Sequence, residues 1–261
     1  MQISSRFTMA IHMFACIDTF SDQKMTSDFM ATSIGTNPVI VRKILQQLKA
    51  AGLIEVARGT GGVTITKTAR EAGEVLSAAV LSQENAEGLD GSGLDFRDCR
   101  FQSCRLRNCD FTGAAFYGCT FTGCLLENCR LSATYWKDCR LSGCKWDGAD
   151  LRRSRWKDSV LEETLLRYVN FSGGVWERIS VKECDFTEST LSEMRLKKAA
   201  MEKTDLTGAE LFRTSLAGMD LTACTLDRIV LSETCRELKG AVINAAQAAV
   251  VARILGIRVE P

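Results

Sequence analysis

Large apolar residues recur at every fifth position over the middle of the chain. The run begins at Phe96, ends at Leu231 and has 28 members without a gap or an insertion. A period of five is neither the 3.6 of an α-helix nor the 2 of a β-strand. It suits a chain that turns a corner every five residues and points one large side chain per side at an axis. Four sides make a coil of 20 residues, so the sequence predicts a square tube of seven coils, roughly 34 Å long at a strand spacing of about 4.8 Å.

The residue two positions before each large apolar residue is usually small. It is cysteine at ten of these positions and alanine, serine or threonine at most others. Repeats such as CDFTG, CTFTG, ADLRR and TDLTG resemble the pentapeptide-repeat family over about residues 94–235. The resemblance implies a right-handed quadrilateral β-helix, an all-β fold that agrees with the square tube. Trp136, Trp156 and Trp176 are 20 residues apart and extend a column that Phe96 and Phe116 begin.

The cysteine positions allow two interpretations. Cys99, Cys119 and Cys139 are 20 residues apart, so they stack on one side of the tube within disulfide range, which would suit a redox or metal role. Alanine, serine and threonine occupy the same slot elsewhere, and this favours simple packing of a small side chain. The chain has 12 Cys but a single His, and its N-terminus does not have the pattern of an export signal. We therefore expect free thiols in a reducing cytoplasm, with no metal and no cofactor.

The first 70 residues follow a helical period instead. Two apolar stripes predict a first helix that is packed on two sides: Phe7, Ala10, Ile11, Phe14 and Ile17 form one, and Met9, Met13, Cys16 and Phe20 form the other. A helix over 27–34, capped by Ser27 or Thr26, should end at Gly35. Asn37 and Pro38 have the residue types of an N-cap and first helical position, so a further helix should follow and end at Gly52. Two short strands should then flank the glycine-rich segment ARGTGG.

This order of elements predicts an α+β winged helix–turn–helix. The stretch TNPVIVRKILQQLKAAGLIEVARGTGG resembles the Rrf2-type bacterial regulators, and the resemblance covers about residues 1–80. In this fold the start of the second helix of the pair enters the DNA major groove. Residues 1–70 carry eight basic and four acidic side chains, a local excess that suits DNA, although the whole chain has a net charge of only +1. The alternative is a tight hairpin tip with a solvated basic face.

The candidate DNA contacts fall into three groups. Thr36, Asn37, Pro38 and Val39 form the turn and first helical residues that would face bases, and Arg42, Lys43 and Arg58 can reach phosphates. Gly59, Thr60 and Gly61 form the tip of the wing. The resemblance also implies that Ser5 and Arg6 approach the DNA backbone.

The sequence departs from the Rrf2 pattern after the wing. Cluster-binding members carry three spaced cysteines there, followed by a long dimerisation helix, whereas 68–93 contain no cysteine. We therefore expect no iron–sulfur cluster. Ala72, Val75, Leu76, Ala79 and Val80 predict an amphipathic helix that completes a domain over 1–82, and 83–93 should be a polar linker. Cys16 is a candidate redox sensor, with buried packing as the alternative.

The C-terminal segment 236–261 should close the tube. An Ala/Val-rich helix over 244–255 is apolar nearly all round, and a short strand over 257–259 should follow it. One side of the helix can cover the last coil, and the other is expected to meet a second copy of the chain. The resemblance to quinolone-resistance pentapeptide proteins implies the same two-fold dimer. Its candidate interface residues are Val242, Ala246, Ala249, Val250, Ile254 and Ile257.

Two functions remain open from the sequence. The first is a cytoplasmic, dimeric transcriptional regulator that reads a palindromic operator in double-stranded DNA and uses the tube for dimerisation, effector sensing or partner binding. The second is a protein that protects DNA gyrase from antibiotics by imitating DNA. Residues 94–235 hold 21 acidic and 21 basic side chains, which weakens the second hypothesis because a DNA mimic must be strongly negative. No nucleophile–base pair, metal-ligand set or membrane span is present in the pattern, so neither an enzyme nor a membrane protein is expected.

Overall fold

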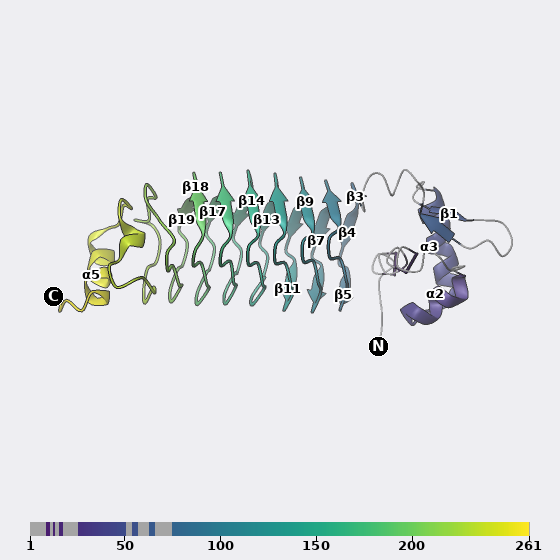
Figure 1. The fold of residues 1–261 in the computed structure, drawn as a ribbon, viewed down its shortest axis with the longest axis horizontal. Helices are drawn as coiled ribbons and strands as arrows, with labels where there is room; N and C mark the ends of the chain where they lie inside the picture. Colours follow the sequence, from purple (N-terminus) through teal and green to yellow (C-terminus); the bar gives the residue numbers. More distant parts are fainter. Residues whose placement is uncertain are drawn as a thin grey trace.

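The computed structural model describes residues 9, 10, 13, 16, 17, 26–50, 54–56, 63–65 and 75–260. A long β-solenoid forms the body of the molecule, with a helical part beyond each of its ends (Figure 1). Before the solenoid come α2 (Ser27–Ile34), α3 (Pro38–Ala50), β1 (Ile54–Val56) and β2 (Val63–Ile65). After it come a 3₁₀ turn (Arg236–Leu238) and α5 (Ala245–Ile254).

Parallel sheets form the walls of the solenoid. The first wall contains β3 (Val75–Ser77), β6 (Asp95–Arg97), β9 (Ala115–Tyr117), β12 (Tyr135–Lys137), β14 (Arg155–Lys157), β16 (Val175–Glu177) and β18 (Arg195–Lys197). The second wall contains β4 (Val80–Ser82), β7 (Arg100–Gln102), β10 (Thr120–Thr122), β13 (Arg140–Ser142), β15 (Val160–Glu162), β17 (Ser180–Lys182) and β19 (Ala200–Glu202). The third wall starts with β5 (Asn85–Glu87), β8 (Arg105–Arg107) and β11 (Leu125–Glu127), and single bridges continue it and build the fourth wall. Paired residues such as Phe101 and Phe121 are 20 apart, so the predicted coil length is confirmed.

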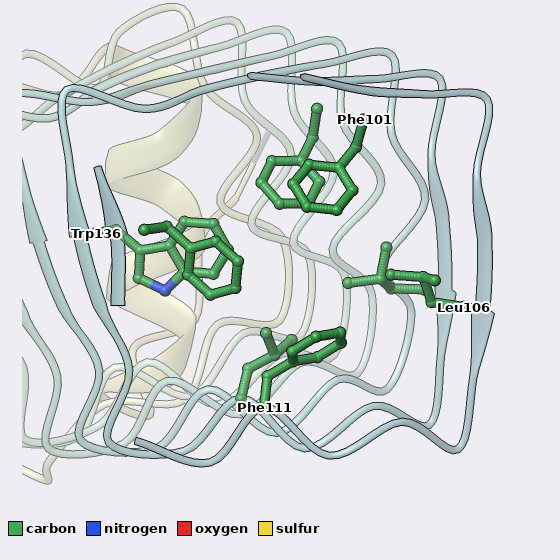
Figure 2. Close-up of a pocket in the computed structure, with 8 residues that line it drawn as sticks. Phe101, Leu106, Phe111 and Trp136 are labelled. Atoms are coloured by element: carbon green, nitrogen blue, oxygen red, sulfur yellow. The ribbon is translucent and has the colours of Figure 1, made fainter. Parts of the chain in front are cut away.

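The large residues of the five-residue pattern fill the interior. Figure 2 shows Phe101, Leu106, Phe111 and Trp136 pointing inward from the four sides. Aromatic rings stack from coil to coil, with centroids 4.0 Å apart for Phe116 and Trp136. The void among these side chains holds about 10 Å³, at most the room of one water molecule. The interior is therefore a packed core rather than a channel, and packing accounts for the tryptophan column.

The small residues of the second slot are also buried, and the cysteine thiols among them bond to backbone carbonyls. The Cys124 Sγ donates to the Phe101 carbonyl of the preceding coil at 3.3 Å, and its equivalents in the neighbouring coils, Cys104 and Cys144, make the same bond at 3.4 Å. Burial raises the pKa of Cys184 to about 11, so its thiol stays protonated at neutral pH. Within the described ranges, no three His, Cys, Asp or Glu side chains are placed to hold a metal ion. These observations support the packing interpretation of the cysteine columns.

Each corner of the tube needs a residue with positive φ. The residue two positions after an inward-pointing centre adopts φ near +50 to +70°, as Asp98 and Asn108 do. Asparagine, aspartate and glycine tolerate this left-handed region best. Short residues such as Asp98 and Asn108 therefore suit these corners, although long residues such as Arg153 and Lys198 adopt the same conformation at others.

The solenoid begins one coil earlier than predicted. The expected helix around 72–80 and the expected linker over 83–93 are both wrong, because β3, β4 and β5 occupy this segment and pair with the coil that follows. The five-residue pattern is hidden here because its last two centres are Ala86 and Gly91. A Cβ atom on Gly91 would lie 2.8 Å from Cδ1 of Phe111, so the Phe111 ring fills the space in place of a side chain.

A separate small core holds the N-terminal part together. Met9, Met13 and Ile17 lie on helical backbone and are buried, and they pack with buried residues of α2, α3 and β1. The buried residues from those elements are Met30, Ala31, Ile34, Val41, Ile44, Leu45 and Ile54. Ala10 and Cys16 are half-buried at its edge, so members of both predicted stripes contact this core. Phe7, Ile11, Phe14 and Phe20 lie outside the described residues.

Candidate nucleic-acid interface

The turn between α2 and α3 has the predicted caps. The Phe29 backbone N–H donates to Thr26 Oγ1 at 3.2 Å, which makes Thr26 rather than Ser27 the cap of α2. Gly35 ends α2 in the left-handed conformation, with φ +69°. The Thr36 N–H then bonds back to the Ala31 carbonyl at 2.9 Å, so the chain turns sharply into α3.

The first turn of α3 is presented outward. Asn37 Oδ1 accepts the Val39 backbone N–H at 2.8 Å and Pro38 occupies the first helical position, as the sequence predicts. Val41 and Ile44 are buried on the opposite side, and this fixes the rotation of the helix. Val39 is therefore 64% exposed and Ile40 38% exposed, so both aliphatic side chains are accessible at the start of the helix.

Ile40 was missed by the sequence analysis. Its spacing of four residues from the buried Ile44 places it with the buried stripe in the sequence, but it lies one turn before the core residues and is 38% exposed, so no pattern along the chain indicated its exposure. Exposed aliphatic side chains on a recognition helix can contact the methyl group of thymine. We add Ile40 to the candidate base-contacting residues.

Arg42 has a structural contact that the sequence did not reveal. Its Nε donates to Ser27 Oγ at 3.2 Å, and its guanidinium lies 3.4 Å from Asp28 Oδ1 at the start of α2. All of these side chains remain accessible, so the contact braces the two helices without removing Arg42 from the surface. Lys43, the next residue, is exposed on α3 and makes no ion pair with any residue that the structure describes.

The wing and the N-terminal contacts are described only in part. β1 and β2 pair antiparallel, with Ile54 opposite Ile65, as expected for the two strands of a wing. Ser5, Arg6, Arg58, Gly59, Thr60 and Gly61 lie outside the described residues, so their predicted contacts stay predictions. Cys16 is half-buried, and its Sγ lies 3.6 Å from Ser33 Oγ. This contact suits packing, and a redox role stays untested.

The other end of the molecule carries the predicted dimer residues. Gln247 is the buried residue of α5, and its Nε2 donates to the Leu221 and Cys224 carbonyls at 2.7 and 2.6 Å. A capping box joins Gln247 and Asn244. The helix is therefore fixed to the last coil by polar groups, and its alanine, valine and isoleucine side chains are exposed or half-buried. Val242 and Ile257, which flank the helix, are 53% and 55% exposed.

The remaining candidates have similar surroundings. Ala246 and Ile254 are exposed, and Ala249 and Val250 are half-buried. The expected strand over 257–259 is wrong, because this segment follows Gly256 without pairing with another strand of the described chain. Helix α5 and this segment lie at the end of the solenoid (Figure 1), and Ile254, Leu255, Ile257 and Val259 are exposed there.

Comparison with known proteins identifies the two parts. A family model described as an iron-dependent transcriptional regulator of the Rrf2 type matches residues 3–80. Models of pentapeptide repeats match 95–132, 116–185 and 184–228. The chain joins an Rrf2-type regulator domain to a pentapeptide-repeat domain. Both resemblances drawn from the sequence are thereby confirmed, and neither family description names an enzyme.

Individual relatives cover only parts of this Rrf2–pentapeptide chain. The putative HTH-type transcriptional regulator YwnA of Bacillus subtilis is 37% identical over 65 residues, which are 25% of this chain and 47% of YwnA. The chain thus spans about half the length of that relative. Among solved structures, QnrB1, a plasmid-mediated fluoroquinolone resistance protein, is 17% identical, with a TM-score of 0.39 over 71% of this chain and 100% of that chain. HetL of Nostoc, involved in heterocyst differentiation, is 18% identical, with a TM-score of 0.23 over 67% and 94%.

The iron-dependent description does not fit the residues of this Rrf2-type domain. The segment after the wing carries no cysteine, and from Val75 onward it is built into the first coil of the solenoid. A cluster therefore has no ligand set at the place where cluster-binding relatives carry theirs.

Among the described residues, no helix is both long and apolar enough to cross a membrane.

Proposed function

We propose that this chain is a sequence-specific, DNA-binding transcriptional regulator whose recognition element is the first turn of α3. The observation that carries the proposal is the exposure of Val39 and Ile40 directly after the capped turn, on a helix whose opposite side is buried. In a major groove such an exposed aliphatic pair gains apolar contact that it lacks in water. The Rrf2-type family match supports the same element.

The roles around this turn follow from chemistry. Val39 and Ile40 contact base edges, and Thr36 supplies a hydroxyl for a base or a phosphate. Lys43 neutralises a phosphate from the next turn of α3. Arg42 reaches a phosphate while its bond to Ser27 holds α2 and α3 at a fixed angle.

A binding assay with matched variants tests this proposal. In vitro selection from random duplexes with the full chain should yield an operator, and titration of that operator gives the affinity. Val39→Ala and Ile40→Ala should reduce the preference for the operator over random DNA, because they remove base contacts. Lys43→Ala should weaken both duplexes alike. Lys49→Ala removes the same charge from the last turn of α3 and should have little effect.

Two outcomes would overturn the proposal. One is the failure of the selection to enrich any sequence. The other is an equal effect of Lys43→Ala and Lys49→Ala, which would mean that the start of α3 does not face DNA.

We further propose that two copies pair through the C-terminal end and read a palindromic operator. The uncovered apolar residues of α5 and the following segment support a second copy as the partner, and Ile257→Asp should give monomers in sedimentation analysis. Bridges of the fourth wall run from Asp90 to Val230 in seven steps of 20 residues, about 34 Å at the usual strand spacing. Two such tubes with two helices of about 10 Å diameter between them span about 90 Å.

This length sets the spacing of the half-sites. The Rrf2-type domain precedes the tube in the chain, so in this dimer the two domains lie beyond the outer ends of the two tubes. Their half-sites should therefore be more than two DNA turns apart, since a turn is about 34–36 Å. Duplexes with half-sites about one, two, three and four turns apart can test this. Tight binding by the dimer is expected at about three turns or more. Tight dimer binding at one turn would show that the chains pair near the DNA-binding domains.

The solenoid surface argues against gyrase protection by DNA mimicry. Acidic side chains on its walls are paired with basic ones one coil away, as Asp110 is with Arg130 at 2.7 Å and Glu127 with Arg107 at 2.8 Å. Such pairs cancel the field that a DNA mimic needs. The filled interior also directs any effector of the regulator to the outer surface.

A further inference from the structure

Unpaired basic side chains gather on one wall of the solenoid. On the first wall, β14 presents Arg155 and Lys157 outward, and β18 presents Arg195 and Lys197 in register two strands away. None of the four lies within 4 Å of a carboxylate in the described part of the chain, although basic residues elsewhere on the solenoid commonly do. We call these four residues the basic wall.

The four cations form a flat array of defined size. Strand neighbours are about 4.8 Å apart, so Arg155 and Arg195 are separated by about 10 Å along the tube. Residues two apart on a strand are separated by about 6.6 Å, which sets the other side of the rectangle. Three of the four are exposed and Lys157 is half-buried. Long side chains on such a flat surface can reach a rod-shaped ligand over its whole length.

Acidic residues near the basic wall are already engaged. Glu177 stands on β16 in register between Lys157 and Lys197, and its carboxylate bonds to Arg178, as does that of Asp158. Glu193 bonds to Arg213 at 3.2 Å. Further cations stand at the corners of this wall, where Arg153 precedes β14 and Lys198 follows β18. Residues 153–158, 173–178 and 193–198 together hold seven basic and three acidic side chains.

The positive charge of the basic wall contrasts with the composition of the distal half of the solenoid. Residues 161–235 as a whole hold 9 basic and 13 acidic side chains, so the positive wall lies partly in a negative half of the solenoid. Grouping unpaired like charges costs free energy through mutual repulsion, unless an anionic partner relieves it.

We propose that the basic wall binds the phosphate backbone of double-stranded DNA without reading its sequence. The ligand class follows from the surface, because a flat array of arginine and lysine with no pocket fits a repeating polyanion better than a small anion. This inference rests on the proposed function for the source of the duplex. A regulator whose half-sites lie far apart has DNA running beside its solenoids, and this wall would neutralise that segment.

The salt dependence of binding tests the proposal. Each phosphate contact contributes about 0.9 to the slope of log affinity against log salt concentration. The triple variant Arg155→Gln/Arg195→Gln/Lys197→Gln of the full chain should make this slope shallower by about 3 on both operator and random duplexes. Between 50 and 200 mM salt, the affinity of the parent chain should therefore fall by a factor roughly 40-fold larger than the affinity of the triple variant.

A control variant removes the same charge from other walls. Arg100→Gln/Arg105→Gln/Lys182→Gln also replaces two arginines and one lysine, all exposed and unpaired among the described residues, on β7, β8 and β17. Its slope should stay close to that of the parent chain. Circular dichroism should show the same fold for both variants.

The outcomes separate this inference from the proposed function. Equal slopes for the wall variant and the control would overturn the basic wall, even if the operator is still preferred. A reduced slope for the wall variant on random duplex, together with no operator preference, would support the basic wall and overturn sequence-specific regulation. A reduced slope on single-stranded RNA but not on duplex would also overturn the proposal as stated.

Discussion

The buried tryptophan column provides a test of how the small slot stabilises the solenoid. Trp156 Nε1 donates to Ser154 Oγ at 3.0 Å, and Trp136 Nε1 donates to Thr134 Oγ1 at 2.9 Å. All four side chains are at most 1% exposed. The equivalent position before Trp176 is Gly174, and the Trp176 indole N–H has no acceptor among the described residues. The same ring thus occurs with and without its hydrogen bond.

Ser154→Ala should destabilise the solenoid by about 1–3 kcal/mol, because it leaves a buried N–H group without a partner. The methyl group left by the substitution fills most of the space, so little of this cost comes from a cavity. Urea unfolding followed by far-ultraviolet circular dichroism measures the free energy, with the slope of the transition checked for each variant.

A double-mutant cycle isolates the hydrogen bond. In a Trp156→Phe background the donor is absent, so Ser154→Ala should cost only a few tenths of a kcal/mol, of the order of the error in such cycles. Trp176→Phe is the matched control. It removes an indole of the same column that has no bond to lose, so it should cost less than Trp156→Phe by about 0.5–1.5 kcal/mol.

Two results would refute the reasoning. Equal costs of Ser154→Ala in the parent and Trp156→Phe backgrounds would mean that the serine acts through packing alone. A larger cost for Trp176→Phe than for Trp156→Phe would mean that packing of the ring, rather than its N–H group, decides the difference.

Three further perturbations test other parts of the molecule. Asn37→Ala should remove about 1 kcal/mol from the stability of the DNA-binding domain, since the Val39 N–H loses its cap, and Asn37→Ser should retain most of it in thermal unfolding. Gly91→Ala should cost about 1–3 kcal/mol by overpacking against the Phe111 ring, and an added Phe111→Leu should recover part of that loss. Burial raises the pKa of Glu237, but hydrogen bonds from the Arg213 N–H and from Ser232 outweigh it and hold the pKa below its ordinary 4.5. The stability that Glu237 contributes is therefore present above pH 4.5 and is lost as the pH falls through the lower pKa of the folded state. Limited proteolysis of the C-terminal cap should therefore accelerate in acid. Glu237→Gln should accelerate proteolysis already at pH 7 and remove its pH dependence.

Much of the solenoid could be predicted because its contacts repeat. A coil of 20 residues places each residue beside its equivalent in the next coil, so one period determined the inward centres, the small slot and the stacking of Phe116 on Trp136. The caps at Asn37 and Gly35 were likewise predictable, because they depend on residues only a few positions apart. Both are local or strictly periodic rules.

Only the tertiary structure decided the contacts that interrupt the five-residue period or join segments far apart in the sequence. The first coil was missed because Gly91 has no side chain of its own and the Phe111 ring from the next coil occupies its space. The sequence predicted that α5 covers the last coil but not through which residue, because the contact is made by a polar residue, Gln247, whose amide bonds to the Leu221 carbonyl. The bond from Arg42 to Ser27 depends on the angle between two helices. In each case the free energy of a position depends on atoms brought near it by folding, and a pattern along the chain does not contain that information.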